Sequence, residues 1–301
     1  MTMEAGALKS AASRPAVNTN PFALGLLRGR LELKQFFRAR TSVIFVFAFP
    51  IILLVIFGLI FKGEIAPGLP FTRYFVAGIV AAGLMSIGFQ SLAIQIPIER
   101  DRGVLKRLAG TPMPRASYFI GKVVMVLVSG LLETAVLLLV ARLFFHVPFP
   151  ETAAKWLTFA WVSLLGISAC TLCGIAFSSV PKEGKQAPSI VTPLALVLQF
   201  ISGVFFSFSQ LPGWMQTVSS LFPLKWMTQG MRAAFLPDFI ATQEPGGSWN
   251  LPIVALVLSG WVVAGFVLCL ATFRWSRVSN HCSAPLQSMA IFTGCLSPRF
   301  C

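Results

Sequence analysis

Six long apolar stretches constrain this chain more than any other feature of its sequence. They run over residues 43–61, 75–98, 118–140, 156–177, 190–208 and 251–273. A helix needs roughly 20 residues to cross about 30 Å of hydrocarbon, which is close to the length of each stretch. Peptide groups inside a bilayer must pair within the protein, and no stretch shows the alternation of barrel strands. The sequence therefore predicts membrane-spanning helices.

The composition excludes a water-soluble protein. Charged residues make up 11% of the chain and hydrophobic residues 56%, whereas a soluble domain has about 25% charged residues. So few charges cannot cover the surface of a soluble globule of this size. The predicted fold class is an all-α membrane protein with six transmembrane helices.

The basic residues predict how the chain is oriented. The net charge is +14, and six crossings place both termini on one side, which collects 18 of the 24 Lys and Arg residues. Because such residues accumulate in cytoplasmic loops, we expect both termini in the cytoplasm and the spans in a bacterial inner or plasma membrane. The charges also favour contact with membrane lipid. They form no contiguous stripe, so nucleic-acid binding is not expected.

The chain divides into three parts. Residues 1–21 are small and polar and are predicted to be disordered. Residues 22–277 form the predicted transmembrane domain, and residues 278–301 a cytoplasmic tail without an assignable role. Within the domain, residues 22–40 predict a helix along the cytoplasmic surface, either a plain interfacial anchor or a helix between lipid and a second protein. Two apolar strips support this helix: Leu24, Leu27 and Leu31, and, on the opposite side, Leu26, Leu33 and Phe37.

The segment from Glu99 to Leu108 predicts a short, highly charged helix between the second and third spans. Val104, Leu105 and Leu108 fall on one side of this helix and charged residues on the other. The Gly-Thr-Pro-Met-Pro run that follows must end it. A charged, capped helix with a small apolar face is typical of a docking surface for a soluble partner. A passive interfacial helix is the alternative.

The region before the last span predicts two short helices separated by Pro223. Residues 209–250 are too apolar to extend into water, so we expect re-entrant or interfacial helices on the outer side. Three tryptophans are expected at headgroup level, namely Trp214, Trp226 and Trp249.

No pattern for enzymatic chemistry is present in the sequence. It contains no Gly-x-x-x-x-Gly-Lys-Ser/Thr, no His-Glu-x-x-His and no Gly-x-Ser-x-Gly, and its two histidines lie far apart. We therefore expect no catalytic residues, no metal and no cofactor. Cys170 and Cys173 share a face of the fourth span, where packing explains them better than redox chemistry. Glu133 is the one acid well inside a span, and either lines a pathway or helix interface or makes a structural hydrogen bond.

The segment after the second span resembles the hallmark of the ABC-2 family of transport permeases. The matching residues are Glu99, Arg100, Asp101, Gly103, Leu105, Lys106, Arg107, Leu108, Thr111 and Pro112. The stretches 202–206, 211–214 and 221–227, with Arg232 following, resemble the family's segment before its last span. The resemblance covers about residues 22–277.

This resemblance implies a six-span subunit that pairs with a second permease subunit, identical or different, and binds separate ABC ATPase subunits. It also implies that residues 99–108 are a coupling helix that docks into the ATPase. The predicted function is the permease subunit of an exporter that moves an amphipathic, lipid-like or drug-like substrate by using ATP hydrolysed in a partner chain. The rival is a secondary transporter driven by an ion gradient. It needs acids inside the membrane, where only Glu133 qualifies, and no internal repeat is visible.

Overall fold

The computed structural model describes residues 20–272 except 62, 67, 112, 207 and 244–246. The predicted tail at 278–301 and nearly all of the segment predicted to be disordered lie outside these residues. The described part is mostly helical, which confirms the all-α prediction. Its helices are α1 (Pro21–Arg38), α2 (Arg40–Ile60), α3 (Phe71–Met85), α4 (Leu92–Asp101), α5 (Val104–Ala109), α6 (Arg115–Phe145), α7 (Ala153–Phe177), α8 (Ala187–Ile201), α9 (Gly213–Ser220), α10 (Pro223–Phe235) and α11 (Leu251–Thr272).

Shorter elements join these helices. A π-helical turn connects α3 to α4, so that one helical segment runs from 71 to 101. A small antiparallel hairpin precedes α3, and two 3₁₀ turns flank the α9–α10 region. These elements are η1 (Ser86–Ser91), β1 (Glu64–Ala66), β2 (Leu69–Pro70), η2 (Phe208–Gln210) and η3 (Asp238–Gln243).

Five helical segments of the described chain are long and apolar enough to cross a membrane. They correspond to the first, second, third, fourth and sixth predicted spans. The fifth predicted span corresponds to α8, which has 15 residues and ends at Ile201. The prediction that this helix continues to residue 208 is therefore wrong. The chain turns at Ser202 and Gly203, and Gly203 has a φ of +72°, a left-handed conformation that commonly ends helices.

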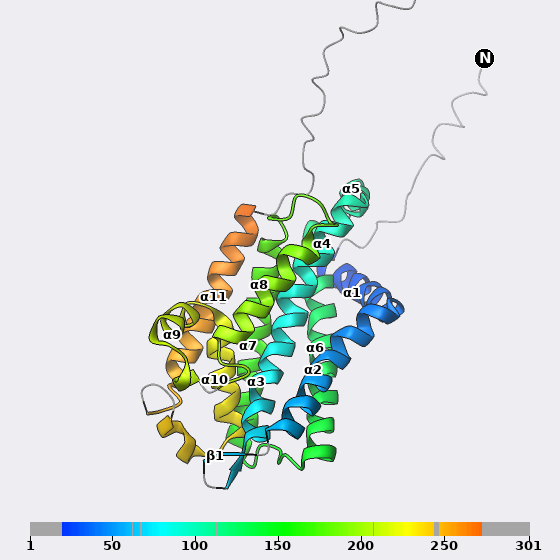
Figure 1. Cartoon of the computed structure of the whole chain (residues 1–301). Coiled ribbons are helices and arrows are strands. Elements are labelled where there is room, and N and C mark those ends of the chain that lie inside the picture. Colours follow the sequence, from blue (N-terminus) through cyan, green and yellow to red (C-terminus); the bar gives the residue numbers. More distant parts are fainter. Residues whose placement is uncertain are drawn as a thin grey trace, which may run out of the picture.

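The segment α3–η1–α4 forms the centre of the bundle. Figure 1 shows it running along the molecule with the other long helices around it. Most of its residues are buried, and it contacts α2, α6, α7, α8 and α10. By contrast, α2 and α11 expose much of their apolar surface, including Phe45 and Leu256. A helix that is apolar all round and exposed on one side is typical of contact with lipid.

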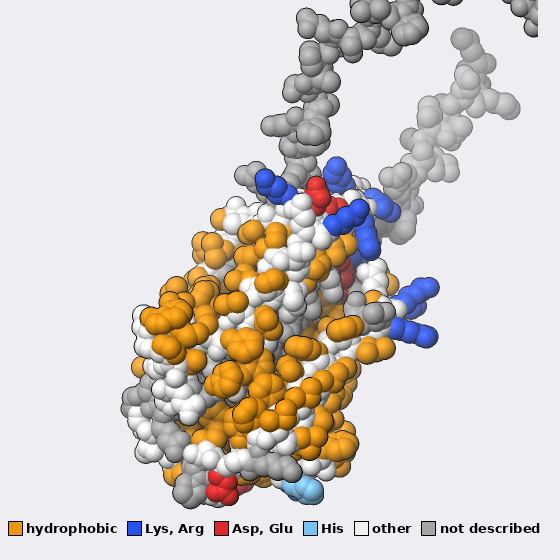
Figure 2. Space-filling view, in the orientation of Figure 1, with side chains coloured by type: hydrophobic (Ala, Val, Ile, Leu, Met, Phe, Trp, Pro, Cys, Tyr) orange, Lys and Arg blue, Asp and Glu red, His pale blue; other side chains and the backbone are white. Residues whose placement is uncertain are grey.

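The surface is divided into an apolar band and a basic end. Figure 2 shows hydrophobic side chains over most of the visible face, with Lys and Arg gathered at the end that carries α5 and α1. The histidine in this view lies at the opposite end, near β1. This distribution matches a protein whose middle lies in lipid and whose ends lie in water.

The two helices predicted before the last span are confirmed as α9 and α10. Pro223 begins α10, where its missing N–H is not needed. Most of α10 is buried, and it contacts α3, α7 and α11. At its C-terminal end Arg73 donates to the Phe235 carbonyl at 3.0 Å and Lys155 to the Leu236 carbonyl at 2.8 Å. Cations at the end of a helix stabilise it through the helix dipole.

The start of the domain needs a small correction. The helix α1 begins at Pro21, one residue inside the segment predicted to be disordered, because the Asn20 side chain caps it by accepting from the Phe22 N–H at 3.1 Å. It ends at Arg38, and the chain turns at Ala39. Arg40, predicted to end this helix, is the first residue of α2.

Candidate functional site: the coupling segment and the buried ion network

Residues 99–108, named the coupling segment here, do not form the single short helix that the sequence predicts. Glu99, Arg100 and Asp101 are the last turn of α4, and a separate helix, α5, begins at Val104. The break lies at Gly103, which has a φ of +71°. A residue without a Cβ adopts this left-handed conformation readily. The segment is therefore a bend between the long central helix and one short surface turn.

Arg100 and Asp101 contact the protein itself. Arg100 donates to the carbonyls of Pro181 at 2.8 Å and Ser178 at 3.5 Å. The Asp101 carboxylate accepts from the Gly184 N–H. These bonds tie the end of α4 to the loop between α7 and α8. The two side chains predicted to dock a partner therefore hold the segment in place.

Residues 105–108 include both buried and exposed side chains. Leu105 is fully buried, which confirms its place on the predicted apolar face. Lys106 and Arg107 are exposed, and Leu108 is half-buried. The Arg107 guanidinium donates to the Arg102 carbonyl at 3.1 Å, which closes the bend. The exposed cations are thus carried by a turn whose Leu105 side chain is anchored in the core.

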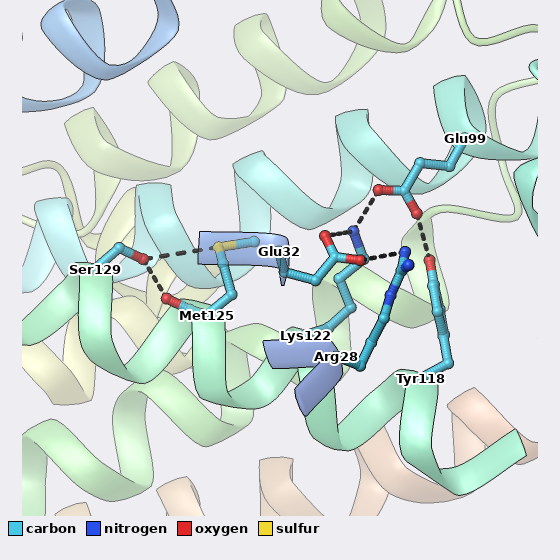
Figure 3. Close-up of polar contacts among 7 residues, drawn as sticks. All are labelled: Arg28, Glu32, Glu99, Tyr118, Lys122, Met125 and Ser129. Carbon is cyan, nitrogen blue, oxygen red and sulfur yellow. Dashed lines mark hydrogen bonds and ion pairs between the residues drawn. The ribbon is translucent and has the colours of Figure 1, made fainter. Parts of the chain in front are cut away.

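A buried ion network links the coupling segment to α1 and α6. We define it by Arg28, Glu32, Glu99, Tyr118 and Lys122. Lys122, fully buried on α6, donates to Glu32 of α1 at 2.8 Å and to Glu99 of α4 at 2.5 Å. Arg28 lies 2.6 Å from the other Glu32 oxygen, and the Tyr118 hydroxyl donates to Glu99 at 2.9 Å. Figure 3 shows the two carboxylates converging on the lysine from different helices.

The network specifies how three segments fit together. Buried charges are costly unless they are paired, so the arrangement is stable only when α1, α4 and α6 are all in register. Taking away one partner of a buried ion pair costs about 3–5 kcal/mol, because the other charge stays buried. Glu99 therefore ties the coupling segment to Lys122 of α6 and, through that lysine, to Glu32 of α1.

Glycines bring α1 against α6. Gly25 and Gly29 lie on the face of α1 that carries Glu32, and a Cβ added to them would lie 2.5 Å from Ile120 and 2.8 Å from Val124. Gly121 is the matching position on α6. This is the close approach that small residues four apart allow between membrane helices. The predicted apolar strips of α1 are not its contact face: Leu26, Leu27, Leu31 and Phe37 are exposed.

Most of the network could not be predicted from the sequence. Two charged positions in the sequence point to it. Glu32 is the single acid in a basic helix, and Lys122 is a charge inside an apolar stretch. The Gly25-x-x-x-Gly29 spacing also indicates close helix packing. None of these signals identifies a partner, because Lys122 contacts Glu32 and Glu99, which lie 90 and 23 positions before it in the sequence.

A second feature is a cleft of about 500 Å³, named the α2–α8 cleft here. It lies between α2, the η1–α4 segment and α8. Gln90 of η1 donates to Thr192 of α8 at 3.3 Å, and Gln199 of α8 donates to Ser86 of η1 at 3.4 Å. A π-helical turn in a helix frequently marks a functional site. The lining residues are Phe36, Phe45, Val46, Phe49, Pro50, Ser86, Gln90, Ser91, Ile94, Gln95, Ile98, Thr192, Leu196 and Gln199.

The remaining predicted residues lie elsewhere. Glu133 is buried in α6 against Gly83 of α3, away from the coupling segment. Cys170 is buried 3.6 Å from the Met227 sulfur, and Cys173 is half-buried on the same helix. Within the described ranges, no group of three or more His, Cys, Asp or Glu side chains is placed to hold a metal ion.

Comparison with known proteins assigns the family. The profile of the ABC-2 type transporter family matches residues 29–236. The inner membrane transport permease YadH of Escherichia coli K12 is 25% identical over 231 residues, which cover 74% of this chain and 83% of YadH. The probable multidrug ABC transporter permease YbhR of the same strain is 23% identical over 195 residues, 64% of this chain and 52% of YbhR. With its apolar helices, its basic end and a profile match that includes the whole coupling segment, this chain belongs to the ABC-2 type transporter family.

Proposed function

We propose that this chain is the permease subunit of an ATP-binding-cassette exporter and that its coupling segment binds a separate ATPase. The observation that carries the proposal is that residues 99–108 combine exposed cations with side chains held inside the bundle. Lys106 and Arg107 are exposed at the basic end, while Leu105 and Glu99 are anchored inside the bundle. Such a turn can bind a soluble partner on one side and move the bundle on the other.

The ion network supplies the route for that motion. Glu99 lies in the last turn of α4, just before the bend, and its carboxylate binds Lys122 and Tyr118 of α6. Force applied to α5 therefore reaches α6 through charge pairs that resist stretching, and reaches α1 through Glu32. An apolar contact at the same place would slide at much lower cost.

The proposed orientation has the basic end and both termini in the cytoplasm. The exposed Lys and Arg residues gather at the end that carries α1 and α5, as Figure 2 shows. Their concentration at one end agrees with the positive-inside rule. In this orientation an ATPase reaches α5 from the cytoplasm, and α9 and α10 are re-entrant helices on the outer side.

In the six-span arrangement that we propose, α8 is the fifth crossing. Its 15 residues span about 22 Å, which is less than the hydrocarbon thickness. The non-helical residues 202–206 that follow are mostly buried, so the rest of the crossing lies against protein. Irregular backbone at membrane depth is tolerated there and not against lipid.

A second permease copy completes the α2–α8 cleft in this proposal. The cleft presents amide and hydroxyl groups at membrane depth, and its lining also includes exposed apolar residues such as Phe45 and Leu196. Lipid chains cannot pair with those polar groups. Two copies that face each other across the cleft would enclose a path lined by apolar and amide side chains. Such a path suits an amphipathic, lipid-like or drug-like substrate, and the multidrug name of YbhR agrees with this class.

Co-purification of an ABC ATPase with this chain from its native membrane tests the proposal. Arg107→Glu combined with Lys106→Glu reverses two exposed charges, so we expect recovery of the ATPase to fall about tenfold while the unfolding temperature stays unchanged. Arg142→Glu is the matched control, because it reverses an exposed cation at the opposite end of α6. Undiminished recovery with the double variant would contradict the docking role of α5.

A further inference from the structure

Glu133 is a carboxyl group buried in the bundle without a hydrogen-bond partner. Its side chain is 3% exposed, and within the described residues neither carboxyl oxygen has a partner. Leaving such a group unpaired in a low-dielectric region is costly, so natural proteins retain it where it is used. The ion network does not include it, because Lys122 lies 11 residues earlier on α6, about 16 Å along the helix axis.

Gly83 separates this carboxyl group from the α2–α8 cleft. A Cβ at Gly83 would lie 2.7 Å from Glu133 Oε1 and 3.0 Å from Oε2, so the carboxyl group is seated against the bare backbone of α3. Gly83 also lines a small cavity between α2, α3 and α8. That cavity shares Phe49, Pro50, Ser86 and Gln199 with the cleft. Gly83 therefore lies between the carboxyl group and a cavity whose lining is continuous with that of the cleft.

The charges at this depth are unbalanced. The lining of the cleft contains no basic side chain to pair with an acid. Aromatic rings are present instead, including Phe36, Phe45 and Phe49, and aromatic faces attract cations. An ionised Glu133 would give this region a negative potential, which favours a cation with an apolar body and disfavours an anion of the same shape.

We propose that Glu133 is the charge-selecting residue of a binding site for lipophilic cations, which are molecules with one protonated amine or quaternary centre on an apolar body. This inference rests on the proposed transport function and names its substrate class. The apolar body lies among the aromatic and aliphatic side chains of the cleft. The cationic centre lies toward Gly83 and Glu133.

Binding exchanges one cation for one proton. In the closed arrangement the Glu133 carboxyl group is neutral, because no cation balances it. When the cation arrives, the O–H bond breaks, the proton leaves to water, and the carboxylate pairs with the cation. The affinity for a permanent cation therefore rises with pH, because the free-energy cost of releasing the proton from the carboxyl group falls as pH rises.

No other charged group accounts for this pH dependence. Glu133 faces Gly83 of α3, and the helices around α6 at this point are α2, α3 and α7 with the turn η1. Besides Glu133, the charged or titratable side chains carried by α2, α3, α6 and α7 are Arg40, Arg73, Tyr74, Arg115, Tyr118, Lys122, Arg142, Lys155, Cys170 and Cys173.

Calorimetry on the full chain in a neutral detergent tests the site with matched probes. Tetraphenylphosphonium is the cation and tetraphenylborate the anion, and empty micelles supply the background for each. We expect the wild-type chain to bind the phosphonium at least tenfold more tightly than the borate. Titration in two buffers of different ionisation enthalpy is expected to show close to one proton released per phosphonium bound.

Three variants separate this role from a structural one. Glu133→Gln keeps the shape and removes the charge, so phosphonium affinity is expected to fall at least tenfold and proton release to disappear, with borate binding unchanged. Gly83→Ala displaces the carboxyl group and keeps its charge, so it also weakens phosphonium binding. Glu183→Gln, an exposed acid in the loop before α8, is the matched control and changes neither.

Equal phosphonium affinity in wild type and Glu133→Gln overturns the proposal. If Glu133→Gln does not fold, the wild-type measurements are sufficient to test the proposal. Phosphonium binding by the wild-type chain without proton release, or without preference over borate, also overturns it. The assay contains no ATPase and no ATP. A loss of ATPase recovery in the co-purification experiment therefore tests the proposed function, and the calorimetry tests the cation site, independently of each other.

Discussion

Lys122 is the residue that connects the most distant parts of the site. Its ammonium group binds carboxylates from α1 and α4, and the residue itself lies about two turns from the start of α6. A lysine inside a span is costly in lipid, but here it is fully buried in protein and doubly paired. The position is therefore explained by its partners and not by its own helix.

We predict that Lys122→Met lowers the free energy of unfolding by about 3–5 kcal/mol, because Glu99 would remain largely buried without a cation and Glu32 would keep only Arg28. The unfolding temperature in detergent measures this loss. Adding Glu99→Gln is expected to recover most of the stability, since Glu32 then still pairs with Arg28 and no other charge of the network is left unpaired. A double variant as unstable as Lys122→Met would contradict the electrostatic explanation.

Residue roles in the coupling segment were only partly predictable. Periodicity placed Leu105 on an apolar face, and it is buried, because the spacing of apolar residues reports burial directly. The same periodicity placed all charged residues on a docking face. Arg100, Asp101 and Glu99 instead bind groups of the protein itself. Charge in a sequence does not reveal whether its partner lies in the same chain, since that depends on tertiary contacts.

At the scale of elements, α1 illustrates how a helix face can be misread. Its leucines suggested the contact face, yet the packed stripe consists of Gly25, Gly29, Glu32 and Phe36. Between helices in a membrane, close backbone approach stabilises more than large apolar side chains do, because lipid is as apolar as leucine. The end of α8 was missed for a different reason: residues 202–208 remain apolar, and hydropathy does not register the left-handed turn at Gly203.

Gly25→Ala is expected to separate α1 from α6. The added methyl group would lie 2.5 Å from Ile120, so the helix must shift or tilt, and we expect a loss of about 1–3 kcal/mol in stability. Gly260→Ala on the exposed side of α11 is the matched control. No atom lies within 4 Å of its added methyl group, and alanine is the better helix former by about 1 kcal/mol. The unfolding temperatures of the two variants should shift in opposite directions. An unchanged unfolding temperature for Gly25→Ala would argue against close packing of α1 and α6.

At the scale of the whole molecule, the separation of charge predicts orientation. Cysteines introduced at two exposed sites, Lys106→Cys and Glu151→Cys, lie at opposite ends of the bundle. In a background whose six native cysteines are replaced by serine, a membrane-impermeant maleimide added to intact cells is expected to label position 151. Position 106 is expected to react only after permeabilisation, because basic loops stay in the cytoplasm. Labelling of position 106 in intact cells would invert the orientation and exclude a cytoplasmic ATPase from α5.

Pairing of two copies across the α2–α8 cleft makes a separate prediction. Val197→Cys lies on the exposed face of α8, and Leu256→Cys lies on the exposed face of α11. In the same cysteine-free background, mild oxidation in membranes is expected to yield a disulfide-linked dimer with the first variant and monomer with the second. The reverse pattern would move the interface to α11.

The ion network also sets an order of biosynthesis. Glu32 leaves the ribosome 90 residues before Lys122, and Glu99 leaves 23 residues before it. Two acids therefore reach the membrane before the one lysine that binds both, and α1 has no docking site on α6 until the third span has been inserted. A nascent chain truncated before residue 122 would hold Glu99 at the insertion machinery without a cation, and Glu32 with Arg28 as its one cation in the network. Insertion of the third span thus completes the packing of the N-terminal half. Quality-control proteins that bind exposed charges would recognise every chain that ends before this span.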